Sequence, residues 1–295
     1  MILFRGSGVA LVTPFINGAV NYDSLRQLID WHVSSGTDAI IVCGTTGESA
    51  TMSREEKQSV ISTATEYAHG RIPVIAGTGG NNTVEAVELS QFAAKAGADG
   101  LLLVTPYYNK ATQNGLVTHF SAIADAAGIP CVLYNVPGRT GLNMNPETVA
   151  RLAGHPLVCG IKEASGDISQ IARIAQLCGD DFALYAGNDD QIVPTLALGG
   201  IGVISVVANV LPKETHEIVQ MFLDGMFAEA RELQLAMLPL IDALFSEVNP
   251  IPVKTALNLM GHNVGLLRPP LSEMEAGSQV SLVRELQAWG LVSRG

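Results

Sequence analysis

Lys162 is the residue of this chain with the clearest chemical potential, because it ends an apolar run, LVCGIK, that has the composition of a buried strand. The chain has six lysines, and the other five lie in segments with helix or loop patterns. One of them, Lys254, lies in the apolar segment IPVKTAL, where we expect the edge of a helix. Burial disfavours an ammonium ion, and a neutral amine can attack a ketone to form an imine. The alternative for Lys162 is a structural ion pair with Glu163 or Asp189.

Polar side chains that follow other apolar runs could complete such a site. Tyr134 ends the preceding run, and its phenol could relay protons as a general acid and base or could simply cap the core. Thr45 and Thr46 offer hydroxyl and backbone N–H groups in one turn, which suits a small carboxylate. Arg139, in the loop PGRTG, could hold a second carboxylate through two hydrogen bonds or could be a solvated surface residue.

Eight short runs rich in Val, Ile and Leu alternate with amphipathic segments, in units of roughly 30 residues. The runs show little polar alternation, which is typical of parallel strands covered on both faces. This pattern predicts a (β/α)8 TIM barrel, whose active site lies at the carboxyl ends of the strands. An open doubly wound sheet is the alternative, but no GxGxxG turn follows the first strand. The predicted strands are 8–13, 39–43, 73–77, 100–104, 130–134, 157–162, 182–186 and 201–205.

The sequence also predicts where several helices begin and where the alternation of strands and helices ends. Ser53 with Glu56 predicts a capping box, Thr83 predicts a helix cap, and Asn145 precedes a proline at a first helical position. The strand pattern stops near residue 225, and segments 226–245, 252–260 and 278–289 have helical patterns. We therefore expect a catalytic barrel over residues 1–224 and a C-terminal helical extension over residues 225–295.

The composition argues against several classes of protein. Hydrophobic residues make up 47% of the chain and charged residues 15%, which predicts a globular protein with a large core. The formal net charge of -11 argues against binding to nucleic acid or to an anionic membrane. The four cysteines form no CxxC pair and the histidines show no metal-ligand spacing, so we expect reduced thiols and no metal site. With no signal-peptide pattern and no apolar run of about 18–20 residues, we expect a cytoplasmic protein.

The motifs together resemble one enzyme family. The segments GTTGES, PVIAGTGGNNTVEA, VTPYYNK, LYNVPGRTG, GIKEASGD and GVISVVAN occur in the order and spacing of the pyruvate-dependent class I aldolases, the superfamily of N-acetylneuraminate lyase. Within that superfamily they are most similar to the dihydrodipicolinate synthase family, over essentially the whole chain. One departure is Asn188 in AGNDD, where many relatives read GDD or SGDD. Because the neighbouring Gly187 is intact, we expect little effect.

The resemblance implies condensation of pyruvate with L-aspartate 4-semialdehyde to 4-hydroxy-tetrahydrodipicolinate, on the diaminopimelate route to lysine. It implies that Lys162 forms the imine. The residues implied to relay protons are Tyr134, Thr46 and Tyr108. The residues implied to bind substrate are Thr45 and Thr46 for the pyruvate carboxylate, Arg139 for the semialdehyde carboxylate, and Gly187 and Ile204 through their backbones.

Family members that are inhibited by lysine bind this effector at a dimer interface. Positions 54 and 57 are His in some of these relatives but are Arg54 and Lys57 here. Two permanent cations should disfavour a cationic effector, so we expect weak or absent inhibition by lysine. The resemblance places this possible effector site at Ser49, Ala50, Arg54, Lys57, Asn81, Glu85 and Tyr107.

The resemblance also implies a homotetramer built from two tight dimers, with Tyr107 reaching into a neighbouring subunit and Tyr108 acting across the interface. An imine is itself an electron sink, so no metal or organic cofactor is expected. Two alternatives stay open: a sister aldolase that acts on a sugar acid or another aldehyde, and an inactive barrel with a binding role. Arg139 and the two tyrosines argue against the first, and the retained Lys162 argues against the second.

Overall fold

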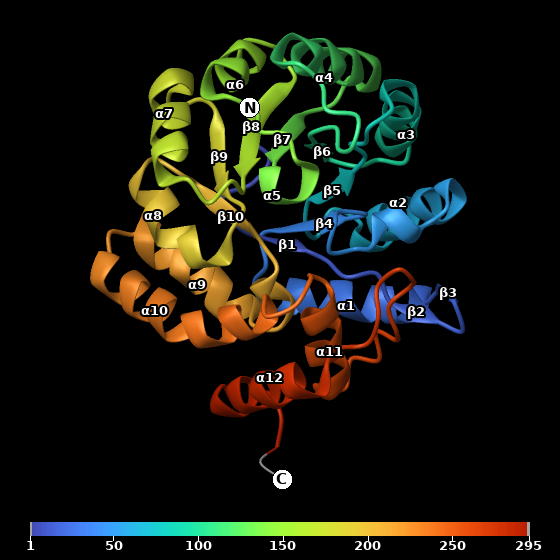
Figure 1. Cartoon of the computed structure of the whole chain (residues 1–295), viewed down its shortest axis with the longest axis vertical. Coiled ribbons are helices and arrows are strands. Elements are labelled where there is room, and N and C mark those ends of the chain that lie inside the picture. The colour runs from blue at the N-terminus through green and yellow to red at the C-terminus, as the bar shows by residue number, and fades with distance from the viewer. Residues whose placement is uncertain (1, 294–295) are drawn as a thin grey trace.

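The computed structural model describes residues 2–293, and its centre is a closed barrel of parallel strands. The order around the barrel is β1-β10-β9-β8-β7-β6-β5-β4, so that consecutive barrel strands are neighbours. Helices surround the barrel, as Figure 1 shows, and the predicted TIM barrel is confirmed. The barrel strands are β1 (Gly6–Ala10), β4 (Ala39–Val42), β5 (Val74–Gly77), β6 (Gly100–Val104), β7 (Cys131–Asn135), β8 (Val158–Glu163), β9 (Ala183–Ala186) and β10 (Gly202–Ser205).

Helices connect each barrel strand to the next on the outside of the barrel. Short 3-10 turns follow three of the strands at their carboxyl ends: η1 (Ser49–Thr51), η2 (Asp189–Gln191) and η3 (Val207–Asn209). The helices that follow the barrel strands are α1 (Tyr22–Ser34), α2 (Arg54–Ala68), α3 (Thr83–Lys95), α4 (Gln113–Ala127), α5 (Pro137–Thr140), α6 (Pro146–Ala153), α7 (Ile168–Cys178), α8 (Ile192–Ala197) and α9 (Pro212–Leu223).

The local signals for helix starts were correct at two of three places. Ser53 and Glu56 form the reciprocal hydrogen bonds of a capping box at the start of α2. Asn145 precedes α6, and a proline occupies the first turn. The cap of α3 was predicted wrongly, because Asn82 rather than Thr83 accepts a hydrogen bond from the backbone N–H of the first turn. The Thr83 hydroxyl instead lies 2.9 Å from Nδ1 of His119 on α4.

The interior of the barrel is filled by side chains from inward-facing strand positions. Ile41, Leu102 and Val132 belong to one buried cluster inside the barrel. The ring of Tyr185 stacks on Phe4 with centroids 4.5 Å apart, and its hydroxyl donates to the Phe4 carbonyl oxygen at 2.8 Å. A packed interior leaves room for a ligand at the carboxyl ends of the strands, as in other barrels of this kind.

A small hairpin, β2 (Phe15–Ile16) and β3 (Ala19–Val20), was not predicted. Its turn residues Asn17 and Gly18 both have positive φ values, 52° and 81°, as a tight hairpin turn requires. The Phe15 backbone N–H donates to the Val264 carbonyl oxygen at 3.0 Å. The hairpin therefore connects the start of the chain to its C-terminal part.

Three further helices follow the barrel: α10 (Phe227–Leu244), α11 (Ile251–Leu259) and α12 (Ala276–Ala288). They agree with the C-terminal helices predicted from the sequence. In Figure 1, α11 and α12 lie below the barrel, and α11 is near α1 and the β2–β3 hairpin. Within residues 2–293, no helix combines the length and the apolar character needed to cross a membrane.

Candidate active site

Lys162 and Tyr134 lie side by side at the carboxyl end of the barrel. They are register partners on the neighbouring strands β8 and β7, so their side chains project from the same face of the sheet. The Lys162 side chain is buried, and its Nζ lies 4.4 Å from the centroid of the Tyr134 ring. The two side chains therefore approach each other closely.

An irregularity in the pairing of β7 with β8 sets this register. Cys131 pairs with Val158, but Val132 pairs with Gly160, so Cys159 is passed over. Such a bulge adds one residue to one strand. Since side chains alternate between the two faces of a strand, this extra residue decides which side chain of β8 stands beside Tyr134.

Neither carboxylate that could have paired with Lys162 does so. Glu163 accepts hydrogen bonds from the Asn135 amide at 3.1 Å, the Ser165 backbone N–H at 2.7 Å and the Gln170 amide at 3.2 Å. The ion pairs found over residues 2–293 do not include Lys162. The ion-pair alternative to imine chemistry is therefore absent from this part of the chain.

Asp189 is held by the backbone instead of by Lys162. It is buried and accepts hydrogen bonds from the backbone N–H groups of Val206 at 3.0 Å and Val207 at 2.9 Å. Burial raises the pKa of the Asp189 carboxyl, while these hydrogen bonds and the charge of Lys162 act in the opposite direction. Asp189 therefore anchors the end of β10 without contacting the amine.

The turn after β4 places Thr45 and Thr46 at the same end of the barrel. The Thr46 hydroxyl oxygen is buried and accepts a hydrogen bond from Nδ2 of Asn249 at 2.9 Å. Thr13 fixes the next residue by donating to the Gly47 carbonyl oxygen at 2.7 Å. No hydrogen bond in the described part of the chain joins either threonine hydroxyl to Tyr134.

A narrow cavity of about 60 Å³ brings most of the predicted site residues together. Its wall also includes Asn188 and Asn249, which were not predicted to belong to the site. A larger cavity of about 280 Å³ adjoins it, since Thr45, Val136 and Arg139 line both. The predicted residues that line the narrow cavity are Thr45, Thr46, Tyr134, Arg139, Lys162 and Gly187.

Arg139 lies on the short helix α5, at the mouth of the cavity. Its Nη2 donates to the Asn249 carbonyl oxygen at 3.3 Å, which leaves other guanidinium N–H groups available for an anion. Gly187 tolerates no side chain, because a Cβ there would lie 2.5 Å from the Cβ of Ala164 and 2.7 Å from the Glu163 carbonyl oxygen. Ile204 lies in the buried cluster inside the barrel, and Val206 two residues later lines the cavity.

The two tyrosines after β6 differ in position. Tyr108 has a positive φ of 69° and a side chain that is 93% exposed, so it does not reach the cavity of its own chain. Tyr107 is 40% exposed and lines the larger cavity. Asn81 fixes this loop by donating from its side chain to the Tyr107 carbonyl oxygen at 3.2 Å.

Only some of the predicted effector residues line the same cavity. Ser49, Ala50, Lys57 and Tyr107 line the larger cavity, whereas Arg54, Asn81 and Glu85 do not. Arg54 forms an ion pair with Glu88 on α3 at 2.6 Å. Glu85 accepts a hydrogen bond from the Asn82 side chain at 3.0 Å. Of the two cations considered in the sequence, Lys57 is therefore the one that faces this cavity.

The prediction for Lys254 was wrong, because this residue is 1% exposed rather than at a helix edge. Its Nζ forms an ion pair with Glu48 at 2.8 Å. Asn249 and Lys254 both contact the turn that carries Thr46, from more than 200 residues away in sequence. The polar residues in the apolar segment NPIPVK were the available signal for these contacts.

Comparisons with known proteins find one enzyme family over almost the whole chain. A model described as the Dihydrodipicolinate synthetase family matches residues 3–289. A 4-hydroxy-tetrahydrodipicolinate synthase of Clostridium perfringens (strain SM101 / Type A) is 57% identical over 290 residues, which are 98% of this chain and 100% of the relative. The crystal structure of dihydrodipicolinate synthase from Aquifex aeolicus matches 99% of this chain and 100% of that one, with 45% identity and a TM-score of 0.97. A chloride-inhibited dihydrodipicolinate synthase from Acinetobacter baumannii, complexed with pyruvate, matches 98% of this chain and 99% of that one, with 42% identity and a TM-score of 0.95.

Proposed function

Because the chain belongs to the dihydrodipicolinate synthetase family, we propose that it condenses pyruvate with L-aspartate 4-semialdehyde through an imine on Lys162. The reaction is that of a 4-hydroxy-tetrahydrodipicolinate synthase, in the biosynthesis of diaminopimelate and lysine. The observation that carries the proposed chemistry is a buried Lys162 beside a phenol ring, with no carboxylate partner among residues 2–293. A lysine in that setting is suited to act as a nucleophile rather than as a structural cation.

The first half-reaction forms the imine. The neutral Lys162 amine attacks the pyruvate ketone carbon, and the carbinolamine oxygen takes up protons and leaves as water. Loss of a methyl proton from the imine then gives an enamine. We assign the proton transfers to Tyr134, Thr46 and Tyr108, and the pyruvate carboxylate to the turn with Thr45 and Thr46.

The second half-reaction joins the two substrates. The enamine carbon attacks the aldehyde carbon, whose oxygen takes up a proton. Arg139 lies at the cavity mouth, where its guanidinium can hold the semialdehyde carboxylate. The amine of the bound semialdehyde then attacks the imine carbon, closes the ring and releases Lys162. Gly187 and Ile204 contribute through their backbones, and no step requires a metal or an organic cofactor.

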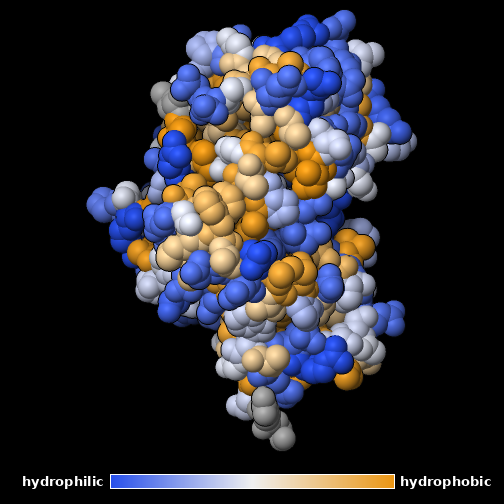
Figure 2. Space-filling view, turned by 90° about the vertical axis from the view of Figure 1, so that its left-hand side faces the viewer, coloured by the Kyte–Doolittle hydropathy of each residue, from blue (hydrophilic) through white to orange (hydrophobic). Residues whose placement is uncertain are grey.

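We also propose a cytoplasmic homotetramer built from two tight dimers. The 93% exposure of Tyr108 supports this, because only a neighbouring subunit could bring that phenol to a cavity. Figure 2 shows hydrophobic residues gathered in the middle of the face on which α7 and α8 lie in Figure 1. Two exposed apolar side chains of α7, Ile168 and Leu177, are of the kind that an interface covers.

Trapping with borohydride tests the proposed chemistry directly. The protein is incubated with pyruvate and borohydride, its intact mass is measured, and the modified peptide is mapped. We expect one stable pyruvate adduct per chain, on Lys162, and none in a Lys162→Met control. Failure to trap pyruvate under conditions that label a known class I aldolase would contradict the proposal. A panel of aldehydes then separates the semialdehyde reaction from that of a sister aldolase.

Lysine inhibition is proposed to be weak or absent. Lys57 lines the larger cavity, and a permanent cation there repels the cationic side chain of a lysine effector. Arg54 adds less repulsion than the sequence suggested, because Glu88 pairs with it. The initial rate measured over a lysine titration checks this, and strong inhibition by sub-millimolar lysine would show that the prediction is wrong.

A further inference from the structure

The segment from Asn249 to Lys254, which leads into α11, does more than pack against the outside of the barrel. On the basis of the proposed function, we propose that it positions the Thr45–Thr46 turn for the pyruvate half-reaction. Asn249 would act on Thr46, and Lys254 would act on Glu48. Both are positioning residues in this proposal, since neither is required to touch pyruvate.

Asn249 connects the two substrate regions of the site. Its Nδ2 donates to the Thr46 hydroxyl oxygen at 2.9 Å, and its carbonyl oxygen accepts from Arg139 Nη2 at 3.3 Å. With its hydroxyl oxygen engaged as an acceptor, Thr46 can direct its own hydrogen toward the cavity. The Asn249 side chain therefore sets the direction of the Thr46 hydroxyl, while the Asn249 backbone holds Arg139.

The burial of Asn249 argues that stability alone does not explain its presence. The residue is 5% exposed, and its buried Oδ1 has no hydrogen-bond partner among the described residues. A buried polar atom without a partner costs free energy, and such an atom in a native protein requires an explanation. Fixing the orientation of a reacting hydroxyl supplies one.

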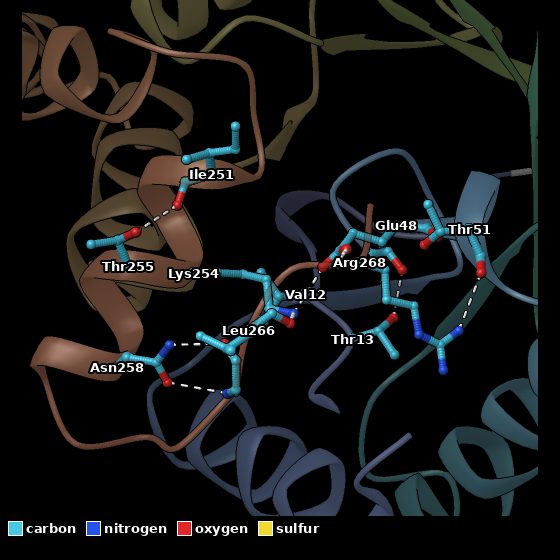
Figure 3. Close-up of polar contacts among 12 residues, drawn as sticks. Val12, Thr13, Glu48, Thr51, Ile251, Lys254, Thr255, Asn258, Leu266 and Arg268 are labelled. Atoms are coloured by element: carbon cyan, nitrogen blue, oxygen red, sulfur yellow. Dashed lines mark hydrogen bonds and ion pairs between the residues drawn. The ribbon is translucent and has the colours of Figure 1, made fainter. Parts of the chain in front are cut away.

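Lys254 holds the other end of the same turn, as Figure 3 shows. Its Nζ donates to Glu48 Oε1 at 2.8 Å and to the Leu266 carbonyl oxygen at 3.0 Å, and the Lys254 and Glu48 side chains are only 1% and 0% exposed. Glu48 has a left-handed backbone with φ of 54°, and its backbone N–H donates to the Thr45 carbonyl oxygen at 3.0 Å. Holding the Glu48 side chain therefore restrains the turn that carries both threonines.

The turn is consequently fixed at three successive residues. Asn249 holds Thr46, Thr13 holds the carbonyl oxygen of Gly47, and Lys254 holds Glu48. Two of these three contacts come from the start of α11. A buried ion pair often contributes little net stability compared with apolar residues of similar volume, so the geometry that it imposes explains its presence better than stability does.

Kinetics of the two half-reactions test the proposal. In a ping-pong reaction, kcat/KM for each substrate reports on its own half-reaction. We expect Asn249→Ala and Lys254→Met to lower kcat/KM for pyruvate and the rate of borohydride trapping by about tenfold or more. kcat/KM for the semialdehyde should change by less than about threefold in Asn249→Ala, because the carbonyl oxygen that holds Arg139 remains.

Thr255→Val is the matched control on the same helix. The Thr255 hydroxyl donates to the Ile251 carbonyl oxygen at 2.9 Å and does not contact the turn. We expect this variant to trap pyruvate within about twofold of the unmodified protein. If Lys254→Met fails to fold, Asn249→Ala carries the test.

Combining Asn249→Ala with Thr46→Val tests whether Asn249 acts through Thr46. If it does, the double variant will trap pyruvate no more slowly than Thr46→Val alone, because the two effects will not add. Additive effects, or equal losses for both substrates that follow the melting temperature, would overturn the inference. Normal trapping by Asn249→Ala would also overturn it while leaving the proposed function intact. Failure of the unmodified protein to trap pyruvate would instead count against the proposed function.

Discussion

Two buried lysines each lie beside an aromatic ring but differ in whether a carboxylate pairs with them. Lys162 is 5% exposed and Lys254 is 1% exposed, and each Nζ lies 4.4 Å from the centroid of an aromatic ring, Tyr134 or Phe15. Lys254 also has the Glu48 carboxylate at 2.8 Å, whereas the ion pairs found over residues 2–293 do not include Lys162. Burial lowers the pKa of Lys254, and Glu48 acts to raise it again. Burial alone therefore does not identify a nucleophile, and the missing carboxylate is the informative feature.

The largest expected difference between the two lysines is in their effect on enzymatic activity. Lys162→Met removes the amine that forms the imine, so turnover should fall roughly 10⁴-fold or more, as when a covalent nucleophile is removed. The fold should survive, because no buried carboxylate loses a partner. The steady-state rate and the thermal midpoint, both measured at one protein concentration, check this. Substantial residual turnover would mean that Lys162 is not the nucleophile.

Lys254→Met should have its main direct effect on stability. It leaves the Glu48 carboxylate buried without its cation, which typically costs about 3–5 kcal/mol. Chemical denaturation at fixed protein concentration measures the loss. Adding Glu48→Gln should recover part of it, since the unpaired charge is then removed. A Lys254→Met protein as stable as the unmodified one would show that the ion pair is not needed for folding.

The two rings beside the lysines form a second matched pair. Tyr134→Phe keeps the ring near Lys162 but removes the hydroxyl, so turnover should fall about 10²-fold, as expected for the loss of a proton relay. Phe15→Leu near Lys254 should leave the rate of pyruvate trapping within about twofold, because that ring faces no reacting group. Measuring both the rate of pyruvate trapping and the turnover of each variant distinguishes a ring that relays protons from one that only packs beside a lysine. An equal loss of turnover in both variants would contradict the contrast.

The smallest expected effect is on folding stability at low pH, through the ion pair of Arg268 with Glu56 near Lys254. The hydrogen bond from Arg268 is the main cause that lowers the pKa of Glu56. A carboxyl with a lowered folded-state pKa adds stability above its unfolded pKa, and loses it as the pH falls from about 4.5 through the folded value. Because this pair is partly exposed, Glu56→Gln should change stability by about 1 kcal/mol or less. Unfolding curves at pH 7 and pH 4 measure the difference, and identical pH dependence in both proteins would exclude the contribution.

The contrast between the lysines also shows how much the sequence could predict. Lys162 was identified because it ends an apolar strand, and strand ends in a barrel meet at one face. Lys254 was misplaced because its partner Glu48 is 206 residues away, and local pattern contains no information about such a pair. Asn249 was missed for the same reason, since Thr46 is 203 residues away.

Other differences between the sequence prediction and the structure have local causes. The β2–β3 hairpin was missed although Asn17-Gly18 is a known turn signal, because its strands have only two residues each. The exposure of Tyr108 could not be derived from the local sequence pattern, because it depends on the positive φ of a loop residue. The roles of Tyr108 and of the effector positions depend on an assembly and stay predictions.

The skipped residue in β8 has a consequence for transplanting this chemistry to another barrel. Deleting Cys159 would leave Val158 opposite Cys131 and Lys162 opposite Tyr134, now on two regular strands. If Cys159 were instead kept and paired with Val132 in a regular ladder, Lys162 would move opposite Asn135, and its side chain would turn toward the helices. A designer who copied the whole β8 sequence onto a regular strand would therefore obtain an amine that faces outward. The copied strand must either keep the bulge or omit Cys159.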